Sequence, residues 1–299
     1  MIDPTLYALV EEQRSYLAEH GDHPADRPDA DPANLLPVEV LNVAGVPVRI
    51  LRPQQPRAIY LHFHAGSYVF GAAAMMDHAN SVLARSIGAI VVSVDYRLVP
   101  AASYPAPIDD AETAALWLIQ NQPFGALPML IGGESVGATI SLLTLLRLRD
   151  RSNHTGNFRG MNLIAGTYDF SMTPSQRLAP ESYFLSPTAL RRTQTTVFPG
   201  LSPEQLRDPA ISPLYANLAH LPPALITVGT ADSVLDDSLF LAARLEAAGG
   251  RAELQVYPEA THPFMTLPTA MAREAHGRVI RFLAAAIVKG AGKEESSFS

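Results

Sequence analysis

The sharpest chemical signal in the sequence is the pentapeptide GESVG at 133–137, which has Ser135 at its centre. It follows the apolar run MLIG and precedes the helical pattern VGATISLLTLL. In a turn of this type between a strand and a helix, small glycines let the chain bend sharply, so that the serine hydroxyl projects from the edge of a sheet. The helix start also favours negative charge that develops there. Ser135 is therefore the candidate nucleophile; the alternative is a serine that only caps a turn or helix.

A serine hydroxyl needs a base to take its proton, and histidine is the usual one. His262 lies in EATHPF, after the strand-like run AELQVYPE and before the last helical pattern. Among the 9 histidines, His276 falls inside that helical pattern, and His154 and His220 lie in polar loops. Position thus selects His262 as the candidate base, although a single loop histidine is by default a surface residue.

The base in turn needs a buried acceptor, which fixes its tautomer and stabilises the imidazolium. Asp232 ends the apolar strand ALITVGTAD and is the candidate for this role. Asp236 and Asp237 compete for it, but carboxylates in the first turn of a helix commonly interact only with its dipole or cap. We therefore interpret Asp236 as structural and Asp237 as solvated.

Attack on a carbonyl carbon produces an oxyanion, which needs backbone N–H donors already in place. After the strand-like run AIYLHF, the segment HAGS forms a turn of small residues. We expect the amides of Gly66 and Ser67 to be donors, together with the amide of Val136 directly behind the nucleophile. The alternative is a tight loop without a catalytic role. Three further residues are predicted to support the site: His64, Glu134 and Asp236.

The elements that must position these residues alternate between short apolar runs and longer helical patterns. Apolar runs without polar alternation are typical of parallel strands covered by helices on both faces. Such strands are predicted at 58–63, 89–95, 128–133, 161–167, 223–229 and 252–257. The intervening helices are predicted near 75–87, 108–121, 136–150, 233–248 and 268–287. The segment 38–51, with a Gly-Val-Pro turn, is predicted to start the sheet as a hairpin or bent strand pair.

Two segments break this alternation. Residues 5–20 have apolar positions at helical spacing and lead into an acidic, proline-rich stretch. Residues from about 170 to 213 are rich in Ser, Thr, Pro and Arg, and so long an insertion in a compact domain is usually functional. With 299 residues, 47% of them hydrophobic, the sequence predicts a single α/β domain over 1–299. Its sheet is mostly parallel and flanked by helices on both faces, with a helical cap formed by about 1–37 and about 170–213.

Composition narrows the range of partners. The net charge of −7 disfavours nucleic acid and anionic lipid surfaces. With no cysteine, the chain has no disulfide, thiolate metal site or cysteine nucleophile. The N-terminus does not look like a signal peptide, and no uncharged apolar run is long enough to span a bilayer. We expect a cytoplasmic protein that takes a small-molecule substrate, inserts in no membrane and uses neither a metal nor an organic cofactor.

Taken together, the motifs resemble the hormone-sensitive-lipase-like esterases of the α/β-hydrolase superfamily, from about Leu51 to the last helix. The resemblance rests on HAGS, DYRLVP, YPAPIDD, GESVGA, DPAISPL, LPPALITVGTADSVLDD and HPF. It implies the α/β-hydrolase fold, a triad of Ser135, Asp232 and His262, and an oxyanion hole at the amides named above. Bacterial members are short-chain carboxylesterases and often dimeric. A serine-dependent carboxylic ester hydrolase that acts on short-chain acyl esters through an acyl-enzyme is therefore expected, and a homodimer is one expectation for its assembly.

Some residues depart from the family pattern. Ala65 and Ser67 replace glycines of the oxyanion loop, and either would be strained if its position needs a positive φ. Glu134 replaces an aspartate and lengthens the reach of the side chain. Ser233 replaces a proline of the turn after Asp232, and Pro263 replaces the glycine after the histidine.

Other residues are assigned to the scaffold, and two other functions stay open. Arg97 and the strand-end aspartate of DYRLVP are predicted to form an internal ion pair that fixes a loop, and Trp117 is predicted to pack in the core. One rival function is hydrolysis of an amide, lactone or carbamate by the same triad. The other is a non-catalytic small-molecule receptor on this fold; such receptors have lost a triad residue, whereas all three are present here.

Overall fold

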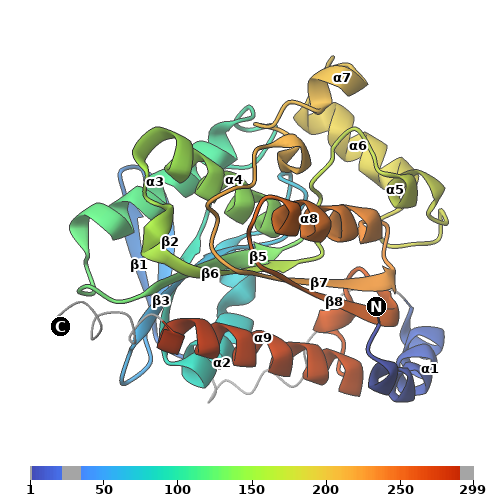
Figure 1. Ribbon diagram of the computed structural model, residues 1–299, viewed down its shortest axis with the longest axis horizontal. Helices are drawn as coiled ribbons and strands as arrows, with labels where there is room; N and C mark the ends of the chain where they lie inside the picture. The colour runs from blue at the N-terminus through green and yellow to red at the C-terminus, as the bar shows by residue number, and fades with distance from the viewer. Residues whose placement is uncertain (1, 22–34, 290–299) are drawn as a thin grey trace.

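The computed structural model describes residues 2–21 and 35–289, and Figure 1 shows their arrangement. The described strands form one 8-stranded sheet in the order β1-β2-β4-β3-β5-β6-β7-β8. The strands are β1 (Val38–Val43), β2 (Val46–Leu51), β3 (Ala58–Phe63), β4 (Ala89–Val94), β5 (Met129–Glu134), β6 (Phe158–Ile164), β7 (Ala224–Ala231) and β8 (Ala252–Thr261). The α-helices are α1 (Val10–His20), α2 (Asp77–Ile87), α3 (Ala106–Asn121), α4 (Val136–Ser152), α5 (Pro174–Leu178), α6 (Pro187–Val197), α7 (Pro203–Leu206), α8 (Leu235–Ala247) and α9 (Ala270–Lys289).

The sheet is mostly parallel, as the sequence predicts. β1 and β2 form the predicted hairpin, with Val43 paired to Val46 and a turn in which Ala44 and Gly45 take positive φ values of 50° and 92°. β2 is antiparallel to β4, and every later pairing is parallel. Because parallel strands point the same way, the residues that follow β3, β5, β7 and β8 all emerge at one edge.

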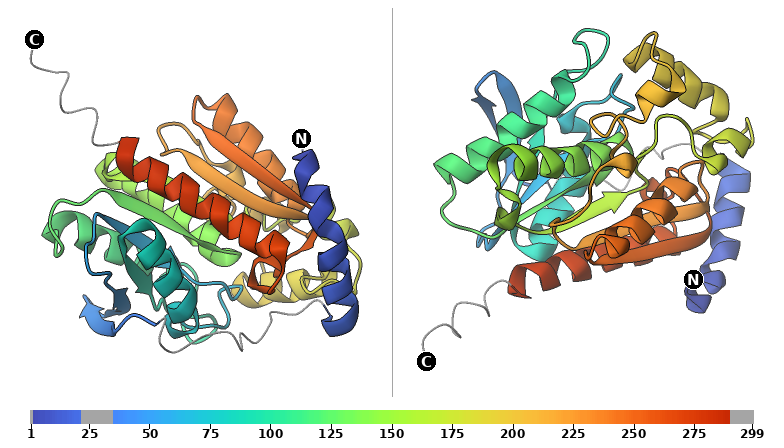
Figure 2. Two further views of the ribbon diagram at one scale, coloured as in Figure 1. Left: turned by 90° about the horizontal axis from the view of Figure 1, so that it is seen from below. Right: turned by 45° about the horizontal axis from the view of Figure 1, so that its top comes forward.

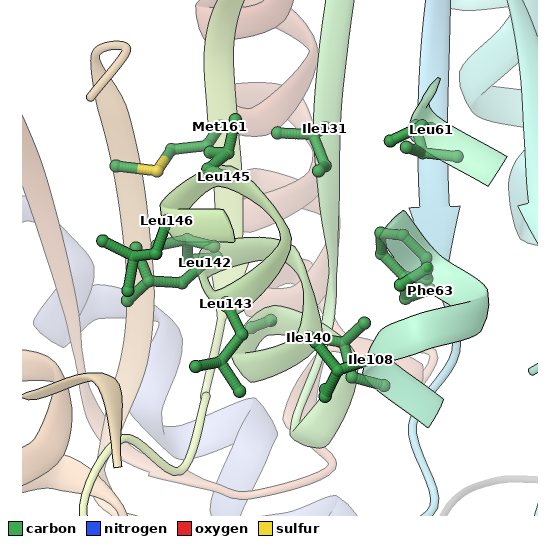
Figure 3. Packing of buried hydrophobic residues seen from close by; sticks show 14 of the residues in the cluster. Leu61, Phe63, Ile108, Ile131, Ile140, Leu142, Leu143, Leu145, Leu146 and Met161 are labelled. Carbon is green, nitrogen blue, oxygen red and sulfur yellow. The ribbon is translucent and has the colours of Figure 1, made fainter. Parts of the chain in front are cut away.

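Helices cover both faces of the sheet, which confirms the predicted layers. α3, α4 and α8 lie on one face, and α2 and α9 lie on the other (Figures 1 and 2). Side chains of β3 alternate between the two cores, since Leu61 and Phe63 pack with α4 whereas Tyr60 packs with α2 and α9. Figure 3 shows the first of these cores, where Ile140 and Leu142 of α4 meet the sheet.

Two strands, β6 and β8, differ from their predicted bounds by three or more residues at one or both ends, and the other predicted strands differ by at most two. β6 spans Phe158–Ile164 instead of 161–167, because Phe158 already pairs with Met129 of β5. β8 continues past the predicted end at residue 257, because Thr261 pairs with Ala231 beyond an irregularity in the β7–β8 ladder. This longer β8 ends directly before residue 262.

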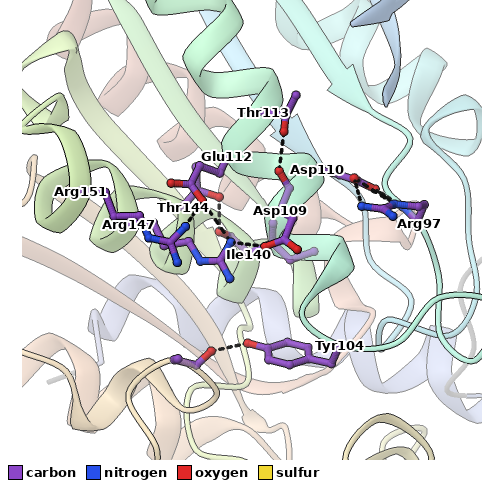
Figure 4. Close-up of polar contacts among 11 residues, drawn as sticks. Arg97, Tyr104, Asp109, Asp110, Glu112, Thr113, Ile140, Thr144, Arg147 and Arg151 are labelled. Carbon is purple, nitrogen blue, oxygen red and sulfur yellow. Dashed lines mark hydrogen bonds and ion pairs between the residues drawn. The ribbon is translucent and has the colours of Figure 1, made fainter. Parts of the chain in front are cut away.

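α3 and α4 are tied together by ion pairs, which Figure 4 shows. Arg147 of α4 lies 2.6 Å from Asp109 and 3.2 Å from Glu112. The predicted pairing of Arg97 with the aspartate of its own DYRLVP motif is wrong. Arg97 instead pairs with Asp110 on α3, at 2.7 Å, because α3 packs beside the end of β4.

The segment predicted as a cap is helical. It contains α5, α6 and α7, which lie beyond α8 on the upper face of the sheet in Figure 1. Of the other predicted cap segment, α1 packs against β8 and α9 at the sheet edge, and residues 22–34 lie outside the described residues. No helix in the described ranges is both long enough and apolar enough to cross a bilayer.

Candidate active site

Ser135 stands at a sharp bend between β5 and α4. Its backbone has φ 53° and ψ −123°, a conformation that costs a non-glycine residue about 1–3 kcal/mol. The bend is held by its own N–H, which donates to the Ile164 carbonyl at 2.8 Å. A Cβ added at Gly137 would lie 2.0 Å from the Phe63 carbonyl oxygen, so only glycine lets the start of α4 pack this close to β3. The sequence motif thus folds as the predicted strand-turn-helix.

The structure brings Ser135, His262 and Asp232 together from three strand ends. His262 follows β8, and its Nε2 lies 3.1 Å from Ser135 Oγ. Its Nδ1 lies 2.9 and 3.0 Å from the two oxygens of Asp232, which follows β7. His154 and His220 lie in loops elsewhere, and His276 lies within α9, where its Nε2 bonds to the Met265 carbonyl.

Burial protects the hydrogen bonds that link Asp232, His262 and Ser135. The side chains of His262 and Asp232 are only 9% and 1% exposed, so water competes weakly for their hydrogen bonds. Asp232 also accepts the N–H of Val234 at 3.0 Å, which fixes the carboxylate. With Nδ1–H donated to the carboxylate, Nε2 carries the lone pair that faces the serine hydroxyl. The arrangement can therefore deprotonate Ser135.

The turn after β3 presents backbone amides beside the serine. Gly66, Ser67 and Tyr68 take φ values of 133°, 53° and 65°, and the Gly66 carbonyl accepts the N–H groups of Val69 and Phe70. Ser67 therefore does occupy a left-handed position, whereas the other glycine replacement, at 65, has no positive φ.

Two of the three amides predicted to form the oxyanion hole belong to residues that line the cavity at Ser135. Within the described residues, the N–H groups of Gly66, Ser67 and Val136 donate to no protein acceptor. Ser67 and Val136 line the same cavity as Ser135, and Gly66 precedes Ser67 in the turn. Such uncommitted donors can bind an oxygen that becomes negative.

His64 contacts the turn that follows β3. Its ring stacks on Tyr96 with the ring centroids 4.2 Å apart, and its Nδ1 lies 2.6 Å from the Ala65 carbonyl oxygen. The Tyr96 hydroxyl donates to the His64 carbonyl at 2.9 Å. Burial lowers the pKa of His64, which favours the neutral ring. These contacts connect His64 with Tyr96 and with the backbone at 64 and 65.

Glu134 is paired with a histidine that the sequence analysis did not single out. Its Oε2 lies 3.1 Å from Nε2 of His62, a buried residue of β3. The other ring nitrogen of His62 lies 2.9 Å from Ser93 Oγ and 3.2 Å from Asn80 Nδ2. The sequence did contain a signal for this pair. His62 lies within the apolar run AIYLHF, which indicates burial, and a buried ring nitrogen needs hydrogen-bond partners.

The two carboxylates at the start of α8 differ in the structure. Asp236 accepts the N–H of Ser175 at 2.8 Å and is partly buried. The prediction that Asp237 is solvated is wrong, because this residue is fully buried and accepts four hydrogen bonds. The first turn of α8 is covered by α5 and the segment before it, which the helix pattern alone did not reveal.

The cavity at Ser135 is small. Its volume is about 20 Å³, which holds about one water molecule. It is lined by Ser67, Ser135, Val136, Thr167, Phe170, Met172, Gln176, Leu185, Leu190, Thr193 and Gln194. Larger hollows lie elsewhere on the surface, such as one of about 650 Å³ next to Arg278. The described residues contain no group of three or more His, Asp or Glu placed to hold a metal ion.

Comparison with known proteins gives consistent results. A family model described as alpha/beta hydrolase fold matches residues 60–266. The carboxylic ester hydrolase LipN of Mycobacterium tuberculosis is 30% identical over 292 residues, covering 89% of this chain and 77% of its own. The ethyl acetate hydrolase of Pseudomonas putida is 29% identical, covering 79% of this chain and 76% of its own.

Solved structures agree with this result. A hyperthermophilic esterase from the archaeon Pyrobaculum calidifontis superposes with a TM-score of 0.76 at 25% identity, covering 97% of this chain and 99% of its own. The hormone-sensitive-lipase homologue EstE7, from a metagenome library, superposes with a TM-score of 0.80 at 24% identity, covering 93% of this chain and 98% of its own. At that identity, the second likeness supports the fold alone.

Proposed function

Because the chain belongs to the family with the alpha/beta hydrolase fold, we propose that it is a serine-dependent carboxylic ester hydrolase of the hormone-sensitive-lipase-like kind that acts on short-chain acyl esters. The observation that carries the proposal is the position of the His262 ring. It lies 3.1 Å from Ser135 Oγ on one side and 2.9 Å from Asp232 Oδ2 on the other.

The proposed reaction is acyl transfer in two stages. Ser135 Oγ attacks the ester carbonyl carbon while His262 Nε2 accepts the hydroxyl proton, and Asp232 stabilises the resulting imidazolium. The carbonyl oxygen becomes an oxyanion, which accepts hydrogen bonds from the backbone N–H groups described above. As the tetrahedral intermediate collapses, the bond to the alcohol breaks and His262 returns its proton to the leaving oxygen. Water then attacks the acyl-enzyme by the same route, which releases the acid and restores the serine.

Two observations support short acyl esters as substrates. Named relatives include a carboxylic ester hydrolase and an ethyl acetate hydrolase. The cavity at Ser135, about 20 Å³, accommodates a short acyl group with less rearrangement of its walls than a long chain would need. A short acyl group is therefore the favoured fit.

The experiment is a comparison of kcat/KM for p-nitrophenyl acetate, butyrate and octanoate. We expect measurable turnover of acetate and butyrate, a lower value for octanoate, and a loss of about 10⁴-fold or more in Ser135→Ala. Ser152→Ala, at the far end of the same helix, is the matched control and should retain activity, because its hydroxyl donates to the Leu148 carbonyl one turn back in that helix. Wild-type-like rates in Ser135→Ala, or highest rates with octanoate, would refute the corresponding part of the proposal.

A further inference from the structure

Asp237 holds a carboxylate that the proposed reaction does not use. It lies in the first turn of α8, fully buried, and accepts four hydrogen bonds. Its Oδ1 accepts the backbone N–H groups of Tyr168 and Asp169, at 2.7 and 2.9 Å. Its Oδ2 accepts the Thr173 hydroxyl at 2.8 Å and the Gln176 side-chain amide at 2.7 Å. All four donors belong to the segment 168–176, which begins four residues after the end of β6 and runs into α5.

A carboxylate in this environment is costly. Burial raises the pKa of Asp237 to about 7, although four donors favour its charged form. A buried carboxylate is retained at low cost only where hydrogen bonds replace its hydration. Here that replacement comes from the segment 168–176, so the position of this segment and the state of the carboxylate depend on each other.

The same segment forms a wall of the cavity at Ser135. Phe170, Met172 and Gln176 line that cavity, and Gln176 is itself one of the donors to Asp237. The amide nitrogen of Gln176 also donates to the Asp169 carbonyl, at 3.2 Å. This amide therefore links the carboxylate, the wall and the open space beside the serine.

The segment is also tied to the turn that carries Asp232. Ser175 Oγ donates to the Ser233 carbonyl at 2.8 Å, and Ser233 Oγ donates to the carbonyl of Leu185 at 2.5 Å. Leu185 is another residue that lines the cavity. Asp237 lies five residues after Asp232. The N-terminal end of α8 therefore positions both the cavity wall and the turn that carries Asp232.

We propose that Asp237 is a positioning residue that holds the segment 168–176 as a fixed wall of the acyl cavity and so limits the acyl chain length the enzyme accepts. The inference rests on the proposed hydrolase function. In it, Asp237 acts through the cavity wall and does not touch the substrate.

Replacing Asp237 with asparagine tests this role with little change in volume. The asparagine oxygen can still accept the two backbone N–H groups that Oδ1 accepts now. Its NH₂ group then faces the Thr173 hydroxyl and the Gln176 amide, which both donate to the carboxylate in the wild type. Thr173 can rotate its hydroxyl to accept, whereas Gln176 cannot accept without turning its amide away from the Asp169 carbonyl. The variant should therefore release the wall at Gln176.

The measurement is the ratio of kcat/KM for p-nitrophenyl hexanoate to that for p-nitrophenyl acetate. We expect this ratio to rise about tenfold in Asp237→Asn, since a few methylenes in an apolar pocket carry discrimination of this size. Thr173→Val, which removes one donor and does not line the cavity, should shift the ratio in the same direction by less. If Asp237→Asn does not fold, Thr173→Val tests the inference: a raised ratio supports it, and an unchanged ratio contradicts it.

Asp110→Asn is the matched control for a buried carboxylate. Asp110 is also buried and accepts a backbone N–H, but it pairs with Arg97 away from the cavity. We expect it to lower the melting temperature and leave the ratio within about twofold of wild type. An unchanged ratio in folded Asp237→Asn, or an equal shift in Asp110→Asn, would overturn the inference. A wild-type protein that hydrolyses neither ester would instead refute the proposed function.

Discussion

Ser135 and Ser67, which line the same cavity, both have strained backbones. Both have φ 53°, in the region that favours glycine. Strain of this kind persists only where the surrounding structure over-determines the conformation, and it is concentrated at functional sites. Here a hydrogen bond to Ile164 fixes the first residue, and the tight turn that begins at Gly66 fixes the second. The amide directions at the candidate site thus depend on close backbone packing.

Gly66→Ala tests that dependence. An added Cβ would lie 1.9 Å from the Phe70 carbonyl oxygen, at a φ of 133° that an alanine rarely adopts, so the turn must shift. We expect kcat for p-nitrophenyl acetate to fall by about 10²–10³, the usual effect of losing an oxyanion donor. Gly156→Ala is the control, because a Cβ there meets nothing within 4 Å. Unchanged kcat in Gly66→Ala would contradict the assignment of these amides.

Sequence reasoning identified residues whose role depends on position along the chain. Ser135, Asp232 and His262 each follow a recognisable strand, and parallel strands bring such residues to one edge. Asp237 and His62 were missed or misjudged because their partners come from segments distant in sequence. The hydrogen-bond partners of a buried polar side chain are decided by packing between distant segments, which local pattern does not encode.

At the scale of elements, α4 anchors the bend that carries Ser135, the candidate nucleophile. The helix is buried along most of its length, with hydroxyls of Ser141 and Thr144 bonded back to carbonyls at 2.8 and 2.7 Å. Its apolar side chains fill the core between the sheet and the helix layer, as Figure 3 shows. The same helix therefore contributes to the stability of the core and holds the geometry of the bend.

Leu142→Ala measures that contribution. Leu142 is fully buried, and removing its side chain should lower the free energy of unfolding by about 2–5 kcal/mol, through lost burial and the cavity left behind. Leu178→Ala makes the same change at a side chain that is 82% exposed and should cost little. Urea denaturation followed by circular dichroism compares the two. Equal losses in both variants would contradict the assignment of α4 to the core.

The cap was predicted as an insertion, and its helices were not delimited. Each of α5, α6 and α7 begins with proline after a threonine or serine, at Thr173-Pro174, Ser186-Pro187 and Ser202-Pro203. In α6 and α7 the serine side chain accepts a backbone N–H, so these pairs are start signals that sequence reading could have used. The short α5 and α7 gave no periodic pattern from which to predict their ends.

At the scale of the molecule, one sheet carries two apolar cores, one on each face. We expect residues 1–299 to fold as a single domain, with the segment 170–213 as its cap, because this segment contacts the core through α8 and the cavity wall. The alternation of strands and helices made the layers predictable. How the segment closes over the cavity could not be predicted, because it depends on contacts between irregular loops.

The most direct test of the account is covalent labelling of the protein by a fluorophosphonate, with the modified peptide identified by mass spectrometry. The phosphonate reacts only with a serine whose hydroxyl is activated by a neighbouring base. We predict one label per chain, on Ser135, with the labelling rate greatly reduced in His262→Ala. Absence of a label on Ser135 in the folded protein, or equally fast labelling of the His262→Ala variant, would contradict the account.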